Sequence, residues 1–293
     1  MSVKKSKGEA IFDILNYIFM CFCIVAFIYP FWQELVLSLS TTEEALAFST
    51  RLFPKKVTFE SYKRVFKSDL IFIGYYNTII RTSVGTILTV IVTYFAAYGL
   101  SKKELPFRNL IITFITFTMF FSGGLIPKFL LIRDLGLMGS RWALILPVLT
   151  SAWNIIIARN FIMMLPKELE ESAFVDGARP ITTVLKIMIP LSMPIIAVLA
   201  LWSAVGHWNA WFDAYLYVRQ REKMVLQLIL RRILIETGRS EDVLKDVGLT
   251  TDLYTPETIK AAMLLVSIGP IIMFYPFLQK YFVKGVIVGS LKG

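Results

Sequence analysis

The sequence predicts an all-α polytopic membrane protein with six transmembrane helices. Hydrophobic residues make up 56% of its 293 positions and charged residues only 18%, whereas soluble proteins usually have about 25% charged residues. The mean hydropathy is correspondingly high, at +0.65. The apolar residues gather in six long segments, each of which is long enough for a helix to cross a hydrocarbon layer about 30 Å thick.

The first apolar segment covers residues 11–39 and follows Lys4, Lys5 and Lys7. A cleaved signal peptide is the alternative reading, but the apolar part of such a peptide usually has about 7 to 15 residues and ends at a small-residue cleavage site. This segment is longer, and no convincing cleavage site follows it. We therefore expect a retained span whose amino end lies inside the cell.

Five further apolar segments follow. They cover residues 71–100, 110–132, 142–165, 191–218 and 261–282. Six spans place both termini on one side, and the density of Lys and Arg, although not their raw count, favours cytoplasmic termini. We expect three parts: residues 1–70 with the N-terminal tail, the first span and an outer loop; residues 71–283 with a five-helix core; and residues 284–293 as a cytoplasmic tail.

Residues 166–190 form a charged connection between two apolar segments, because they carry seven Lys, Arg, Asp or Glu residues. Each ionised group would cost about 2.5 kcal/mol or more in hydrocarbon, so this connection is expected at a membrane surface. Pro166 suits the first turn of a helix, and acidic residues at 168–171 suit its positive N-terminal end. Gly177 allows a turn, and Pro180 can open a second helix.

The spacing within this connection is more specific than its composition. Glu171-Ser172-Ala173 is followed by three residues, then Gly177, nine more residues and Ile187-x-Ile189-Pro190. This pattern resembles the EAA loop of the membrane subunits of ABC importers, where the usual residues are Glu-Ala-Ala, Gly and Ile-x-Leu-Pro at the same intervals. The alternative is an ordinary amphipathic loop with solvated carboxylates.

The resemblance implies an ABC importer permease fold with a cytoplasmic EAA coupling helix that docks into a cleft on a separate ATPase subunit. Glu171 would then offer a carboxylate to a cation of that subunit, Ala173 would let the two backbones approach, and Gly177 would set the bend. Ser172 and Asp176 complete the expected coupling set.

Other segments are similar to the maltose-type carbohydrate permeases, especially the branch for large oligosaccharides. They are residues 121–127 (FSGGLIP), 135–137, 141–147 and the tail from residue 281. The tail is similar to the C-terminal tail of a maltose permease, which implies that residues 283–293 reach the interface between two ATPase subunits. A frayed basic tail is the alternative.

The branch implies an oligosaccharide substrate, and the basic residues of the expected outer loops favour an acidic one, such as a uronate oligomer from alginate or pectin. These residues are Lys55, Lys56, Arg219, Arg221, Lys223, Arg231 and Arg232. Contact with lipid phosphates or with a binding protein is the alternative role for them.

Polar residues inside the spans are candidates for the translocation path, because polar groups in a membrane are usually functional or paired. They are Asn77, Asn154, His207, Asn209 and Asp213. On one continuous helix, Asn209 and Asp213 would share a face. A satisfied core histidine is the alternative for His207. For Arg81 and Arg159, which also lie in the spans, the alternative expected is snorkelling toward the headgroups.

Several kinds of site are absent from the sequence. No Gly-x4-Gly-Lys-Ser/Thr loop is present, so ATP and Mg²⁺ are expected on partner subunits and not on this chain. The single histidine, with Cys21 and Cys23 two positions apart, suggests no metal or catalytic set. The net charge of +10 is assigned to lipid headgroups and not to nucleic acid.

The favoured hypothesis is therefore a permease subunit in a bacterial inner membrane. Its expected partners are a second, related permease subunit, two ATPase subunits, and an extracytoplasmic solute-binding protein that docks on the outer loops at residues 41–70 and 219–260. An integral-membrane enzyme, a non-transporting scaffold and a permease for another solute are the alternatives.

Overall fold

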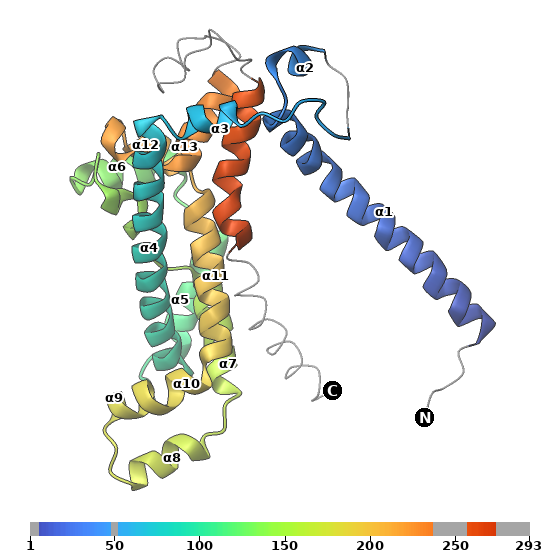
Figure 1. Cartoon of the computed structure of the whole chain (residues 1–293). Coiled ribbons are helices and arrows are strands. Elements are labelled where there is room, and N and C mark those ends of the chain that lie inside the picture. Colours follow the sequence, from blue (N-terminus) through green and yellow to red (C-terminus); the bar gives the residue numbers. More distant parts are fainter. Residues whose placement is uncertain (1–5, 48–51, 237–256, 274–293) are drawn as a thin grey trace. The chain divides into compact units, whose positions relative to one another are not determined.

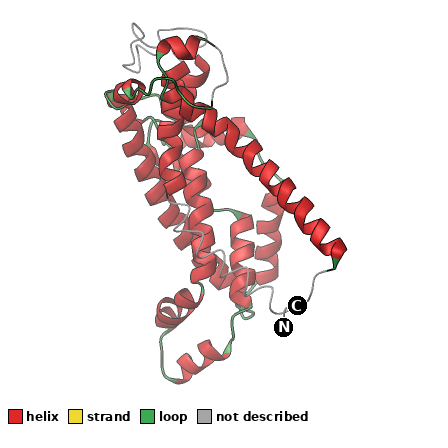
Figure 2. Ribbon diagram, turned by 45° about the vertical axis from the view of Figure 1, so that its right-hand side comes forward, coloured by secondary structure: helices red, strands yellow, loops and turns green. Residues whose placement is uncertain are grey.

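The computed structural model describes residues 6–47, 52–236 and 257–273. Within these ranges every regular element is a helix and there is no strand, as Figure 2 shows. The predicted all-α class is confirmed for the described residues.

The helices follow one another along the whole described chain (Figure 1). The α-helices are α1 (Lys7–Ser38), α2 (Thr42–Leu46), α3 (Glu60–Val65), α4 (Asp69–Ser101), α5 (Arg108–Phe120), α6 (Leu125–Asp134), α7 (Ala152–Met163), α8 (Glu168–Val175), α9 (Pro180–Thr183), α10 (Ile189–Leu191), α11 (Met193–Asn209), α12 (Phe212–Tyr217) and α13 (Leu226–Arg231). Short 3₁₀ and π segments are η1 (Arg141–Leu144), η2 (Leu146–Val148), η3 (Val184–Met188), η4 (Arg221–Lys223) and η5 (Arg232–Glu236). A further helix covers residues 257–273.

The chain divides into two compact units: a first unit of residues 1–69 and 232–268, and a second unit of residues 70–231 and 269–293. In the first unit, α1 begins with a capping box, in which the Ser6 hydroxyl accepts from the Glu9 amide and the Glu9 carboxylate accepts from the Ser6 amide. This pair satisfies two backbone donors at the helix start. The apolar window of α1 is entirely exposed within this chain, which suits contact with lipid or with another subunit.

Two single helices, α1 and α4, are long and apolar enough to cross a membrane. Three further segments pass the same test only as bent pairs: α5 with α6 at 115°, η1–η2 with α7 at 52°, and residues 180–191 with α11 at 79°. The described residues thus offer two to five spans. The predicted sixth span, residues 261–282, is described only up to residue 273, so the count of six stays a prediction.

The predicted segment 110–132 is not one straight helix. Helix α5 ends at Phe120, the chain extends at Phe121, and α6 begins after Gly124, whose φ is +84°. A residue with a side chain is strained at such a φ, whereas glycine is not. The two glycines at 123 and 124 therefore end the helix inside the apolar run, which hydropathy alone does not reveal.

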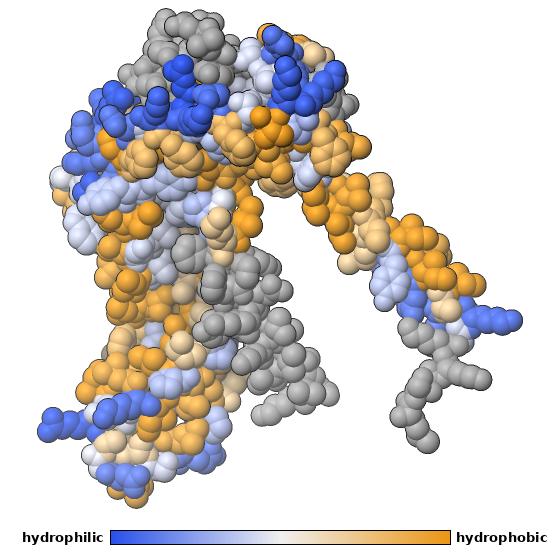
Figure 3. Space-filling model, viewed as in Figure 1, coloured by the Kyte–Doolittle hydropathy of each residue, from blue (hydrophilic) through white to orange (hydrophobic). Residues whose placement is uncertain are grey.

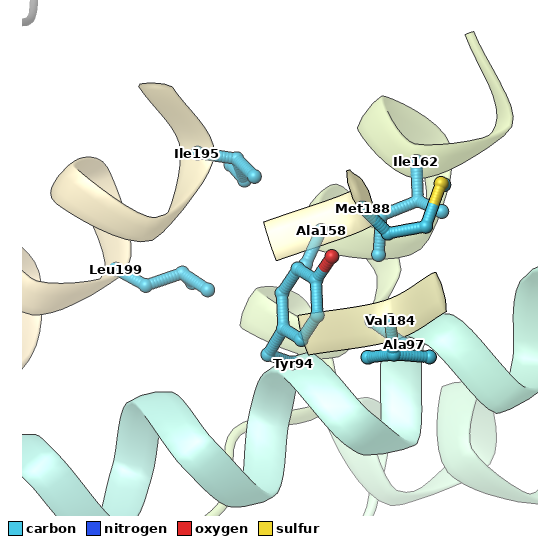
Figure 4. Packing of buried hydrophobic residues seen from close by; sticks show 8 residues of the cluster. All are labelled: Tyr94, Ala97, Ala158, Ile162, Val184, Met188, Ile195 and Leu199. Atoms are coloured by element: carbon cyan, nitrogen blue, oxygen red, sulfur yellow. The ribbon is translucent and has the colours of Figure 1, made fainter. Parts of the chain in front are cut away.

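The core of the second unit joins four elements, α4, α7, η3 and α11. Figure 4 shows its side chains, which are Tyr94, Ala97, Ala158, Ile162, Val184, Met188, Ile195 and Leu199. Ala97 of α4 and Ala158 of α7 are fully buried in this core. This core holds both ends of the charged connection, because α7 leads into it and η3 leads out of it.

Candidate functional site

The charged connection folds as the predicted helix, bend and second helix. Helix α8 begins at Glu168 and ends at Val175, with three glutamates in its first turn. Figure 1 shows α8 at one end of α4, and α6, α12 and α13 at the other end. Blue, hydrophilic side chains gather around α8, whereas orange, apolar side chains cover much of the neighbouring length of the second unit (Figure 3).

Gly177 ends α8 in a Schellman motif. Its amide donates to the Phe174 carbonyl at 3.0 Å, and the Ala178 amide donates to the Ala173 carbonyl at 2.9 Å. Gly177 has φ +77°, the left-handed conformation that this motif requires and that glycine adopts without strain. The predicted turn at Gly177 is confirmed.

The chain then returns to the core of the second unit through a bent helical segment. Pro180 is the first residue of α9, as predicted, and its missing amide donor costs nothing there. The segment continues through η3 and α10, and Ser192 marks the 79° bend into α11.

The predicted coupling residues divide between the two faces of α8. Glu171, Ser172, Asp176 and Gly177 are exposed, whereas Ala173 is buried within the chain. The Ser172 hydroxyl donates to the Glu168 carbonyl at 2.8 Å and is thus satisfied inside the helix. Ala173 packs inward in this chain, so its small side chain already serves a contact within the chain.

Apolar side chains are exposed beside these carboxylates. Val175 is 87% exposed, and Leu169, Phe174, Ile181 and Leu185 are exposed as well. An exposed apolar group rimmed by polar residues is typical of a protein interaction surface. The exposed face of α8 and α9 thus has the composition of a docking site.

Glu170 is not among the predicted coupling residues, yet it has the strongest contacts in this region. It is buried, and its carboxylate accepts from the Tyr98 hydroxyl and forms an ion pair with Lys102. The Lys102 ammonium also lies 4.3 Å from the centre of the Tyr98 ring. The partners are 72 and 68 residues apart in sequence, so local spacing gives no signal for them.

A cavity of about 490 Å³ opens beside this ion pair. Its lining includes Lys102, Glu170, Phe174, Met163 and Met188. The contact between α8 and the body of the second unit is therefore incomplete, and the Glu170–Lys102 pair bridges it.

The polar residues predicted for the path lie in different surroundings. Helix α11 ends at Asn209, and Ala210 is extended before α12 begins at Phe212. The expectation that Asn209 and Asp213 share one helical face is therefore wrong. Asn209 is exposed, whereas Asp213 turns toward Arg81 on α4.

Arg81 does not snorkel. Its side chain is buried, with an ion pair to Asp213 and hydrogen bonds to the Ala210 carbonyl at 3.1 Å and the Leu144 carbonyl at 3.3 Å. Because helix α11 ends at Asn209, the Ala210 carbonyl can accept a hydrogen bond from Arg81. The guanidinium therefore links α4 to the break between α11 and α12 and to α12 itself.

Asn77 is 2% exposed, and its amide nitrogen donates to the carbonyls of Glu222 and Met224 at 2.8 and 3.0 Å. Its oxygen accepts from Arg141 Nε at 2.9 Å. These contacts hold residues 222–224 against α4. The side chain is fully engaged within the chain.

The other two path candidates differ in exposure. His207 is buried against Gly85 of α4, so closely that a methyl group at position 85 would overlap its ring. Asn154 is half-buried in the first turn of α7, where its backbone amide donates to the Ser151 hydroxyl at 3.5 Å. The packing of His207 therefore agrees with the alternative prediction of a core histidine. Among the described residues, no group of three His, Cys, Asp or Glu side chains could hold a metal ion.

Known transport proteins are similar to this chain over almost its whole length. The polygalacturonan/rhamnogalacturonan transport system permease protein YtcP of Bacillus subtilis is 37% identical over 284 residues, covering 97% of this chain and 99% of that protein. The arabinooligosaccharides transport system permease protein AraQ of the same organism is 25% identical and covers 99% of this chain and 100% of that protein. No protein-family model matches the chain.

A solved structure is similar over nearly the whole length. It is a bacterial ABC transporter involved in the import of the acidic polysaccharide alginate, with a TM-score of 0.88 and 32% identity, covering 96% of this chain and 100% of the matched chain.

Proposed function

The chain belongs to the permease subunits of ABC sugar importers, and on that premise we propose that its exposed α8–α9 surface is the coupling surface for an ATPase subunit. The chain is an integral membrane transport subunit and not an enzyme. The observation that carries the proposal is α8 itself: an exposed Glu171 and an 87% exposed Val175 on a helix that Gly177 ends.

The proposed assembly contains this chain, a second related permease subunit, two ATPase subunits that hold ATP and Mg²⁺, and an extracytoplasmic solute-binding protein. If α8 faces the cytoplasm, the other end of α4 and residues 219–225 face outside. Both termini are then cytoplasmic. Two parts of this proposal lie outside the described residues. They are residues 283–293, proposed to dock on the ATPase subunits, and residues 237–256 of the proposed outer loop.

An oligomer of uronic acids is the proposed substrate. Polygalacturonan and alginate, named for two of the similar proteins, both consist of sugars with carboxylates. Arg219 and Arg221 are exposed at the proposed outer end, where positive charge would raise the local concentration of an anionic substrate. We place exposed Asn209 and half-buried Asn154 nearest the translocation path, and we assign Asn77, His207 and Asp213 to the framework around it.

The coupling surface is tested in proteoliposomes that contain the whole complex. Replacing Glu171 by Ala is expected to lower uptake and binding-protein-stimulated ATP hydrolysis about tenfold or more, as loss of a central interface residue does, while membrane insertion persists. Glu104→Ala, at an exposed glutamate in the loop between α4 and α5, is the control outside this surface. Equal uptake by the Glu171 variant and the control would refute the assignment.

The substrate class is tested with the same complex. Oligogalacturonates and oligomers from alginate are expected to stimulate ATP hydrolysis, whereas neutral arabino-oligosaccharides of equal length are expected not to. Stimulation by the neutral oligomers alone would overturn the uronate assignment and leave the transport role intact.

A further inference from the structure

One face of α4 contacts both the coupling helix and the bend into α11. Tyr94 and Tyr98 are four residues apart and lie above one another on α4, and Lys102 directly follows Ser101, the last residue of that helix. Tyr98 and Lys102 bind Glu170 of α8, and the Tyr94 hydroxyl donates to the Ser192 hydroxyl at 3.1 Å. Both ends of the charged connection are thus joined to the same stripe of α4.

Glu170 and Glu171 are neighbours with opposite surroundings. Glu171 is exposed on the proposed docking face, whereas Glu170 is buried and paired. A helix turns about 100° per residue, so one side of α8 can meet an ATPase subunit while the adjacent side is held by α4. The two carboxylates therefore cannot have the same role.

The ion pair has mechanical importance because it joins α8 to the end of α4, whereas the main packing contacts of α8 with other helical segments are with α9 and η3. The helix has eight residues, and isolated helices shorter than about 12 to 15 residues are marginal in water. The cavity of about 490 Å³ lies between part of α8 and the rest of the second unit. A force on α8 can reach α4 either through the Glu170 contacts or, less directly, through the connecting chain at each end.

We propose that Glu170 is a positioning residue that ties α8 to α4 through Lys102 and Tyr98, so that the coupling helix and this span move as one rigid element. The inference rests on the proposed function of α8. It adds the route by which a displacement of α8 would reach the membrane-spanning helices. The displacement passes from α8 to α4 through Glu170, and then from α4 to the bend before α11 through Tyr94 and Ser192.

The first test replaces Glu170 by Gln in the complete complex. We expect the ATPase subunits to co-purify as before and basal ATP hydrolysis to persist, because the exposed face of α8 is unchanged. Uptake per ATP hydrolysed is expected to fall about tenfold, near the upper range for residues in coupling networks. Glu104→Gln, at an exposed glutamate in the loop between α4 and α5, lies outside the proposed docking face; it is the control and is expected to behave as the wild type.

The charge-reversed pair, Glu170→Lys with Lys102→Glu, is expected to recover uptake that either single reversal loses. A merely local stabilising role would lower the amount of complex without changing uptake per ATP. Wild-type uptake per ATP in Glu170→Gln would overturn the inference alone, whereas absence of uptake by the wild-type complex would refute the proposed function.

A crosslink keeps the test decisive if Glu170→Gln does not assemble. Glu170→Cys and Lys102→Cys are combined in a chain in which Cys21 and Cys23 are replaced by Ala, and the new thiols are joined with a short bifunctional reagent. If the contact between positions 170 and 102 holds α8 rigidly to α4, crosslinking should restore the uptake that the double-cysteine variant has lost. If crosslinking instead abolishes the remaining uptake, α8 must move relative to α4 and the inference fails.

Discussion

The guanidinium of Arg81 on α4 lies buried against the carboxylate of Asp213 on α12, a residue 132 positions later. The same guanidinium binds the carbonyl of Ala210, at the break between α11 and α12. One side chain thus closes the end of α11 onto α4. Its removal would take a charged donor from the half-buried Asp213 carboxylate and from the carbonyls of Ala210 and Leu144.

The first prediction concerns this pair. Replacing Arg81 by Met is expected to lower the free energy of unfolding by about 1 to 3 kcal/mol, because the half-buried Asp213 carboxylate and the carbonyls of Ala210 and Leu144 lose a charged donor. The thermal midpoint of the complex in lipid nanodiscs measures the effect. Arg133→Met is the control, since the Arg133–Asp134 pair is exposed and such pairs contribute at most about 1 kcal/mol. Equal midpoints for the two variants would contradict the structural role of Arg81.

The second prediction concerns the contact between α4 and α11. A methyl group at Gly85 would lie 2.7 Å from ring carbons of His207, so Gly85→Ala is expected to destabilise the second unit by about 1 to 3 kcal/mol through overpacking. Gly99→Ala, on the same helix with open space around it, should stabilise by about 0.5 to 1 kcal/mol. The thermal midpoints of both variants measure these changes in stability. Recovery of stability on adding His207→Ala would identify the imidazole as the obstacle.

The third prediction concerns the end of α8. Gly177→Ala keeps the space around the residue open but forces an alanine into φ +77°, at a cost of about 1 to 2 kcal/mol. Uptake is expected to fall, with Gly177→Asn milder because asparagine tolerates this conformation better. Gly206→Ala, at an open helical position of α11, is the control. A larger loss in the control would show that the left-handed turn is unimportant for coupling.

The fourth prediction concerns the docking surface. Val175→Lys is expected to leave the stability of the isolated chain within about 0.5 kcal/mol, as exposed substitutions do, but to weaken binding of the ATPase subunit about tenfold or more. Val57→Lys, also at an exposed valine but in the proposed outer loop, should leave that binding unchanged. Titration of the ATPase subunit onto nanodisc-embedded chain measures both. Equal affinities would exclude Val175 from the interface.

Local features of the candidate site can be predicted from the sequence. The positions of Pro180 and Gly177 depend on backbone rules that act within a few residues, and both predictions are confirmed. The break after Phe120 is not predicted, because an apolar run hides the effect of Gly123 and Gly124. The snorkelling expected of Arg81 is wrong, since its acceptor comes from a distant part of the chain.

The order of amino acids by itself determined the helical class, the apolar segments and the shape of the charged connection, because hydropathy and backbone preference act over short distances. Only the tertiary structure decided that Glu170 faces Lys102 while Glu171 faces outward, and that Arg81 meets Asp213. The physical reason is that a buried charge is stable only beside its partner, and which side chains become neighbours is settled when the helices pack.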